Sequence, residues 1–173
     1  FATVLELGKV VFPVTVIVTI LKYTSIIQIL SEALKPIMGI FGLTGESAIV
    51  LVLGNLLYFY AAIGAMLTME LTVKQVYILA VMLSFSHSLL VETAITLKMG
   101  VKPWLVALIR LGISFLAAFL INIFWSGGQE RAVYLLSMTP DETLTAWPDI
   151  LLSSVLAGLN SVLQIAVIVI PVM

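Results

Sequence analysis

The sequence contains no cysteine and a single histidine, and this scarcity of reactive side chains excludes several kinds of site. Without cysteine there is no disulfide, thiolate nucleophile or cysteine-ligated metal, and the redox compartment stays undetermined. One histidine cannot build a multi-histidine metal site, and the HExxH, GxSxG and glycine-rich phosphate-loop motifs are missing. We therefore expect no enzyme activity, catalytic residue, cofactor or bound metal, with a Ser84–His87 intramembrane hydrolase as the residual alternative.

Charged residues are also scarce. They make up 10% of the 173 residues, whereas hydrophobic residues make up 62%. Soluble domains contain about 25% charged and about 45–50% apolar residues, so this chain has far more apolar surface than a soluble core can bury. The net charge of −1 offers no basic surface for nucleic acid. The composition therefore predicts an all-α, polytopic helical membrane protein whose first partner is the lipid bilayer.

Long apolar runs divide the chain into about four to five spanning helices within a single membrane domain, residues 1–173. One segment places charges opposite an apolar stripe at helical spacing, which predicts a helix lying in the membrane interface. In chain order, the predicted elements are a first span (1–24), the interfacial helix (25–41), a second apolar run (42–68), a third span (73–98), a fourth span (103–125), an external loop (126–148) and a fifth span (149–173).

The second apolar run is interrupted by Gly54-Asn55 and by Gly64, and two folds fit it. It is either one spanning helix or a re-entrant hairpin of two half-helices with Gly54-Asn55 at its tip. Non-helical backbone at this depth must be buried in protein or line water. The sequence does not decide between them. The apolar-Pro-Val pattern at Pro13 recurs at Pro171, so the fifth span is also a candidate for the start of a second repeat.

Two lysines orient the fourth span. Lys98 and Lys102 lie in the turn before it, whereas the segment after it is mostly acidic. The excess of Lys and Arg in cytoplasmic loops places the turn in the cytoplasm and residues 126–148 outside. A re-entrant second run would then put the N-terminus inside.

The densest polar cluster at membrane depth lies in the third span. On a continuous helix, Ser84, Ser88 and Glu92 follow one another at i+4 and form one stripe, with His87 beside it. This cluster either binds a solute or ion, or relays a proton through His87, because histidine changes charge near neutral pH. Alternatively, its serines and histidine join helices by hydrogen bonds. We favour the functional interpretation because Glu92 adds a charge where serine alone would serve.

Arg110 in the fourth span provides a partner for Glu92. Both residues lie nine positions from Val101 at the centre of the turn (101 − 92 and 110 − 101), so antiparallel helices would bring them to a similar depth. An ion pair would lower the cost of burying both charges. The spacing therefore predicts a pair in which Arg110 is primarily structural.

The fifth span carries its own polar stripe. Asn160 and Gln164 are i+4 partners that either line a site or join helices. Ser154 and Gly158 form a small-xxx-small pair, which favours close packing of helices.

The segments Gly42-Leu-Thr-Gly-Glu-Ser-Ala48 and Ser86-His-Ser-Leu-Leu-Val-Glu92, with the glycine-interrupted run between them, resemble the nucleoside recognition (Gate) domain family. That family of bacterial integral membrane proteins is related to concentrative nucleoside transporters and to the gate regions of ferrous iron transporters. The resemblance implies an interfacial helix, a re-entrant hairpin beginning near Gly45, and a following helix with a polar break. Two such repeats in inverted orientation would surround a midplane site, so a homo-oligomer or a second Gate half is also implied.

By this resemblance, the chain is expected to be a Gate-type, multi-pass transport protein of the bacterial inner membrane. It would move a small polar solute, such as a nucleoside-like molecule, an organic anion or an ion. The alternative is a non-transporting structural membrane subunit whose polar stripes only hold helices together. The predicted substrate-binding residues are Glu46, Ser47, Asn55, Ser86, His87, Ser88, Glu92, Asn160 and Gln164, and the predicted structural ion pair is Glu92 with Arg110.

Overall fold

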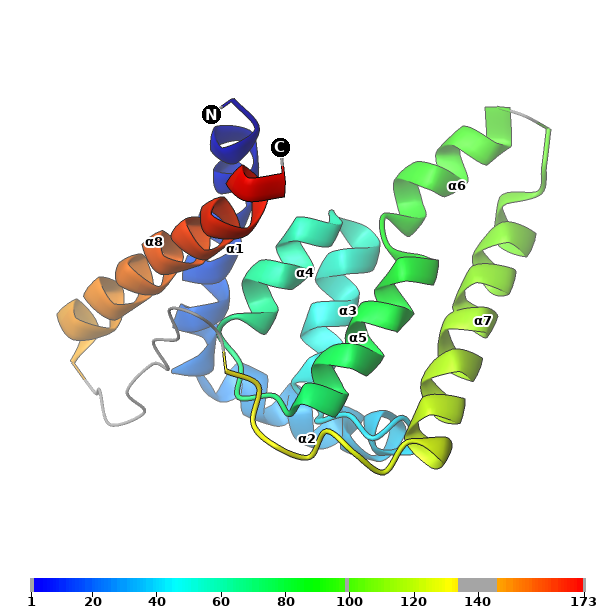
Figure 1. The fold of residues 1–173 in the computed structure, drawn as a ribbon, viewed down its shortest axis with the longest axis horizontal. Helices are drawn as coiled ribbons and strands as arrows, with labels where there is room; N and C mark the ends of the chain where they lie inside the picture. The colour runs from blue at the N-terminus through cyan, green and yellow to red at the C-terminus, as the bar shows by residue number, and fades with distance from the viewer. Residues whose placement is uncertain (1, 99, 134–145, 173) are drawn as a thin grey trace.

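The computed structural model describes residues 2–98, 100–133 and 146–172, and every regular element among them is a helix. Figure 1 shows three groups side by side: α1 with α8, the central helices α3, α4 and α5, and the pair α6 and α7. The helices are α1 (Ala2–Lys22), α2 (Ser25–Ile40), α3 (Ser47–Leu56), α4 (Phe59–Met66), α5 (Val73–Ser86), α6 (Leu89–Lys98), α7 (Pro103–Phe124) and α8 (Trp147–Val172).

The chain bends by 87° where α1 passes into α2. The Thr24 hydroxyl donates to the carbonyl of Leu21 at this corner, over 2.7 Å. Helix α2 covers the predicted interfacial segment almost residue for residue and lies across the ends of the central helices (Figure 1). Its apolar residues Ile26, Ile29 and Ile37 are exposed. This arrangement suits a helix in the membrane interface, a location that stays a prediction.

The second apolar run forms two short helices, α3 and α4, which pack against each other as a hairpin. They contain ten and eight residues. At about 1.5 Å per residue, neither can cross a hydrocarbon core about 30 Å thick. The break lies at Leu57-Tyr58, so the prediction of a tip at Gly54-Asn55 is wrong. Gly54 is instead a packing position inside α3, because a Cβ there would collide with Leu83 of α5.

The predicted third span is also divided. It consists of α5 and α6, which are separated at His87-Ser88 and both pack along α7. Among the described residues, Val73–Thr93 and Pro103–Phe124 are long and apolar enough to cross a membrane, and the bent α1–α2 pair would be a third such span. The predicted four to five spans also include the second run, which is split into α3 and α4, and the fifth span, where some side chains of the 26-residue α8 lie outside the described residues.

Small residues allow the closest helix contacts. A Cβ on Gly158 of α8 would come within 2.8 Å of the Phe12 ring of α1, so glycine lets the two helices approach each other. Thr15 of α1 is fully buried and donates to the Gly64 carbonyl of α4 over 3.3 Å. The main core lies between α3, α4 and α5; its fully buried members include Val50, Ala62, Ala65, Ile78, Leu79 and Leu83.

The segment after α7 returns to the start of α5 and caps it. The Lys74 amide donates to Gly128 O over 2.8 Å and the Val73 amide donates to Glu130 O over 3.0 Å, so these first-turn N–H groups of α5 have partners. The Lys74 ammonium donates to Asn122 O at the end of α7. Residues 134–145 of the predicted external loop lie outside the described residues.

Candidate functional site

The polar site is built on the break between α5 and α6. The amide of His87 closes the last turn of α5 by donating to Leu83 O over 2.8 Å. Ser88 then adopts a φ of 51°, in the left-handed region that residues other than glycine rarely occupy. Helix α6 starts afresh, with the Glu92 amide donating to Ser88 O. The expectation of one continuous stripe from Ser84 to Glu92 is therefore wrong, whereas the polar break that the family resemblance implies is present.

The end of α3 meets this break. Because Ser88 has left the helical conformation, its amide is free to donate to the Gly54 carbonyl in the last turn of α3, over 2.8 Å. The ring of Phe59, the first residue of α4, lies edge-on to the His87 ring with 5.8 Å between centroids. Four helix ends therefore gather around His87: the C-terminal ends of α3 and α5 and the N-terminal ends of α4 and α6.

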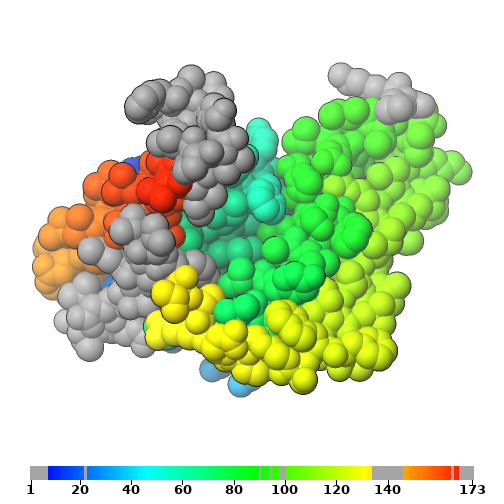
Figure 2. Space-filling view, in the orientation of Figure 1, coloured from blue at the N-terminus to red at the C-terminus, as the bar shows by residue number. Residues whose placement is uncertain are grey.

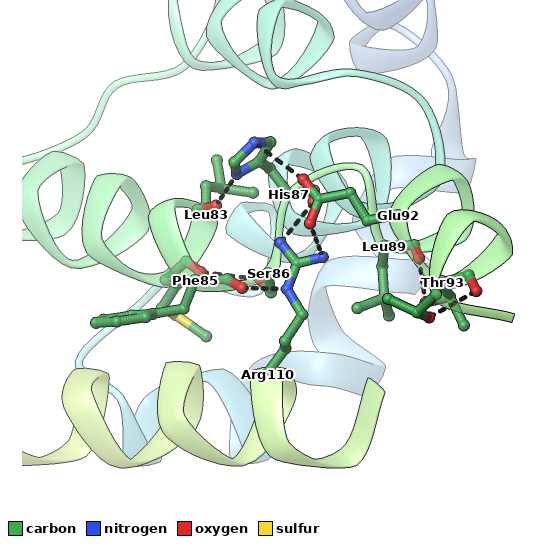
Figure 3. Close-up of polar contacts among 10 residues, drawn as sticks. Leu83, Phe85, Ser86, His87, Leu89, Glu92, Thr93 and Arg110 are labelled. Carbon is green, nitrogen blue, oxygen red and sulfur yellow. Dashed lines mark hydrogen bonds and ion pairs between the residues drawn. The ribbon is translucent and has the colours of Figure 1, made fainter. Parts of the chain in front are cut away.

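Arg110 of α7 joins the two sides of the break (Figure 3). Its Nε donates to Phe85 O over 2.7 Å and its Nη2 donates to His87 O over 3.1 Å. Its Nη1 lies 2.5 Å from Glu92 Oε2 in the first turn of α6. One guanidinium thus supplies donors to the exposed carbonyl end of α5 and also holds the carboxylate. The structure pairs Glu92 with Arg110, as the spacing about the turn predicts.

His87 makes two different contacts through its ring. Nδ1 lies 2.8 Å from Leu83 O. A carbonyl oxygen only accepts hydrogen bonds, so Nδ1 must carry a proton. Nε2 faces Glu92 Oε1 at 3.7 Å, which is beyond hydrogen-bond distance. The two side chains keep 36% and 43% of their surface, so this contact is not sealed inside the fold.

Asn55 and Ser86 flank this centre in different ways. The Asn55 side-chain oxygen is buried at the end of α3 and has no hydrogen-bond partner in the part of the chain that the structure describes. The Ser86 hydroxyl is buried and donates to Met82 O, an acceptor that it shares with Ser114 of α7. Ser86 therefore joins α5 to α7, and Ser88 acts through its backbone.

The remaining predicted site residues lie elsewhere. Glu46 and Ser47 are at the N-terminal end of α3, whereas His87 packs at its C-terminal end; the Ser47 hydroxyl bonds Thr44 Oγ1 over 2.9 Å. Asn160 and Gln164 are on α8, which packs along α1 and not along the α5–α6 break. The structure thus brings His87, Ser88 and Glu92 together, with Asn55 next in sequence to the Gly54 carbonyl that accepts from Ser88. It places Glu46, Ser47, Asn160 and Gln164 away from this break. Among the described residues, no three metal-ligating side chains gather.

Sequence reasoning missed three contributors to the site: the carbonyls of Gly54 and Phe85 and the ring of Phe59. Carbonyl groups carry no sequence signal of their own. The only available signal was the interruption at Gly54-Asn55, which marks where the hairpin approaches α5. Phe59 resembles any other apolar residue of its run.

A helical bundle with membrane-length apolar helices, a hairpin of half-helices and an ion pair beside a polar break defines the chain as a helical membrane protein. The nucleoside recognition (Gate) family matches residues 4–102, and the chain belongs to this family. The chain is 43% identical over all 173 of its residues to an uncharacterized membrane protein, YvoD, of Bacillus subtilis (strain 168). It spans 55% of the length of that relative. No solved structure matches the chain.

Proposed function

We propose that this protein is a Gate-type transport protein that moves a small polar solute across the bacterial inner membrane. The solute classes that fit are a nucleoside-like molecule, an organic anion or an ion. The single observation that carries the proposal is the meeting of the α3 end with the α5–α6 break around His87 and Glu92.

Interrupted helices support this function for a physical reason. Each break leaves backbone groups without helical partners, and the hydrocarbon core has no water to satisfy them. Transporters accept this cost where helix ends point at a substrate or an ion. Here the helix ends come with the partly exposed His87–Glu92 pair, which offers acceptors to a solute bearing N–H or O–H groups, and the unpartnered Asn55 oxygen lies buried at the end of α3.

The open position of the site supports access by a solute. Figure 2 shows α6 at the edge of the molecule beside α7, and the side chains of His87 and Glu92 at the start of α6 keep 36% and 43% of their surface. One Gate repeat offers only one wall of such a site. We propose that a second Gate half, in a longer chain or in another copy, supplies the opposite wall within the bilayer.

A ligand-stabilisation screen tests this function. The purified protein in detergent is heated with nucleosides, amino acids, carboxylates or divalent metals, and the melting temperature is recorded. We expect one class to raise the melting temperature of the wild type. His87→Ala and Asn55→Ala should lose this effect while staying monodisperse, whereas Ser84→Ala should keep it because Ser84 only bonds Val81 O on the exposed side of α5.

The contacts of Arg110 favour the second candidate function, a non-transporting structural membrane subunit. Its contacts already satisfy both carbonyls and the carboxylate from within the chain, as a non-transporting scaffold would require. In that case no solute class would raise the melting temperature. His87→Ala would then cost only the loss of a membrane hydrogen bond, about 0.6 kcal/mol on average.

A further inference from the structure

The geometry of the break assigns a second property to the same site. We propose that His87 and Glu92 form a proton-operated latch between α5 and α6. Hydronium gives a proton to the Nε2 lone pair of His87 and is left as water, while the hydrogen bond from Nδ1–H to Leu83 O is kept. Protonation of His87 would regulate the site described under the proposed function, and the latch rests on that function for its purpose. The latch itself can be measured on the protein alone, without a solute.

In the open state of the latch, the His87 ring is neutral and its Nε2 does not bond Glu92. This state follows from the contact of the ring with Leu83. Because Nδ1–H donates to Leu83 O, the neutral ring must carry its lone pair on Nε2. That lone pair faces Glu92 Oε1, another acceptor, across 3.7 Å. Two acceptors facing each other repel, and the neutral state therefore holds the first turn of α6 away from the last turn of α5.

Protonation reverses this contact. Nε2 becomes a donor, and an imidazolium facing a carboxylate makes a charge-assisted hydrogen bond. Such bonds require a shorter separation than 3.7 Å, so the first turn of α6 is drawn toward α5. The Ser88 amide, which bonds Gly54 O, ties this movement to the end of α3.

The neighbouring charges keep Glu92 ready for the latch. Arg110 of α7 holds Glu92 Oε2 and leaves Oε1 for His87. Helix α3 contains no titratable residue; α4 contains Tyr60 and presents the Phe59 ring to His87. The titratable residues of α5, Lys74 and Tyr77, lie at its opposite end. Glu92 and Arg110 are thus the charged groups that contact His87 in the described structure.

The presence of a single histidine makes the first measurement unambiguous. In the full chain with ¹⁵N-labelled imidazole, NMR over a pH series should show a neutral ring protonated on Nδ1 at the alkaline end and a doubly protonated ring at the acidic end. A neutral ring protonated on Nε2 would overturn the proposal, because the lone pair would then face Leu83.

The second measurement is amide hydrogen exchange in the first turn of α6, corrected for the intrinsic effect of pH. We expect several-fold stronger protection at about pH 5 than at about pH 8 in the wild type. His87→Gln and Glu92→Gln should each lose this difference, whereas Glu70→Gln, an exposed acid away from the break, should keep it.

Equal protection at both pH values, or an unchanged difference in His87→Gln, would overturn the latch. If His87→Gln does not fold, Glu92→Gln provides the same comparison. The ligand screen has a separate outcome: a protein that responds to pH but to no solute keeps the latch and loses the transport function. A protein stabilised by a solute but insensitive to pH does the reverse.

Discussion

Replacing Arg110 with leucine removes three interactions at once, and this gives the sharpest test of how the break is held. Phe85 O and His87 O lose their side-chain donors, and Glu92 loses its cation. The Arg110 side chain is only 17% exposed, so water replaces these donors poorly. We therefore expect Arg110→Leu to fold but to be clearly less stable than the wild type.

The magnitude follows from the partners. Hydrogen bonds to charged groups contribute about 1.5–3 kcal/mol each, and the lower limit suits a site that is partly open. The two carbonyls then account for about 3 kcal/mol. The ion pair adds up to about 1 kcal/mol, because Glu92 keeps 43% of its side-chain surface. For a chain of this length, a loss of about 3–4 kcal/mol lowers the melting temperature by roughly 10 °C.

Two companion variants make this result decisive in a thermal unfolding assay of the purified protein. Adding Glu92→Gln to Arg110→Leu should restore only about 1 kcal/mol, because it removes the stranded charge but leaves both carbonyls without donors. Arg131→Leu breaks an exposed pair with Glu70 and should cost less than about 1 kcal/mol. An Arg110→Leu protein as stable as Arg131→Leu would refute the reasoning, and full rescue by Glu92→Gln would reduce Arg110 to an ion-pair partner.

Two further predictions concern the backbone and the topology. Ser88→Gly should keep or raise the melting temperature and Ser88→Val should lower it, because a side chain at φ 51° costs about 1–3 kcal/mol; equal melting temperatures would contradict a strained turn. If the α3–α4 hairpin re-enters the membrane, single cysteines at Thr44 and Glu70 in this cysteine-free chain should react with an impermeant thiol reagent from the same face. Cysteines at Lys102 and Ser126, which flank α7, should react from opposite faces, and labelling of Thr44 and Glu70 from opposite faces would exclude the re-entrant hairpin.

The structure was predictable where the sequence carries a hydrophobic pattern or where a partner follows from counting residues on either side of a turn. Apolar runs located the helices, and equal spacing about Val101 located the partner of Glu92. The break at His87-Ser88 was invisible to periodicity, because serine and histidine fit a helix as well as a turn. What interrupts the helix comes from residues far away in sequence: the Gly54 carbonyl and the Arg110 guanidinium. For the same reason, the sequence did not show that Asn160 and Gln164 lie on a helix that packs along α1, away from the break; their role in binding stays a prediction.

Some polar groups at the break already have partners and others do not, and this difference separates the residues that hold the structure from those that can bind a proton or a solute. Arg110 donates through Nε and Nη2 to backbone carbonyls and forms an ion pair with one Glu92 oxygen, and Ser88 uses its amide on Gly54, so these groups maintain the break itself. Among the described residues, His87 Nε2 and the Asn55 oxygen have no hydrogen-bond partner. A proton or a solute can engage the partly exposed His87 Nε2 without first breaking an existing bond, whereas the buried Asn55 oxygen must first be uncovered. Changes of state at this site should therefore begin at His87, while Arg110 keeps the two halves of the broken helix together.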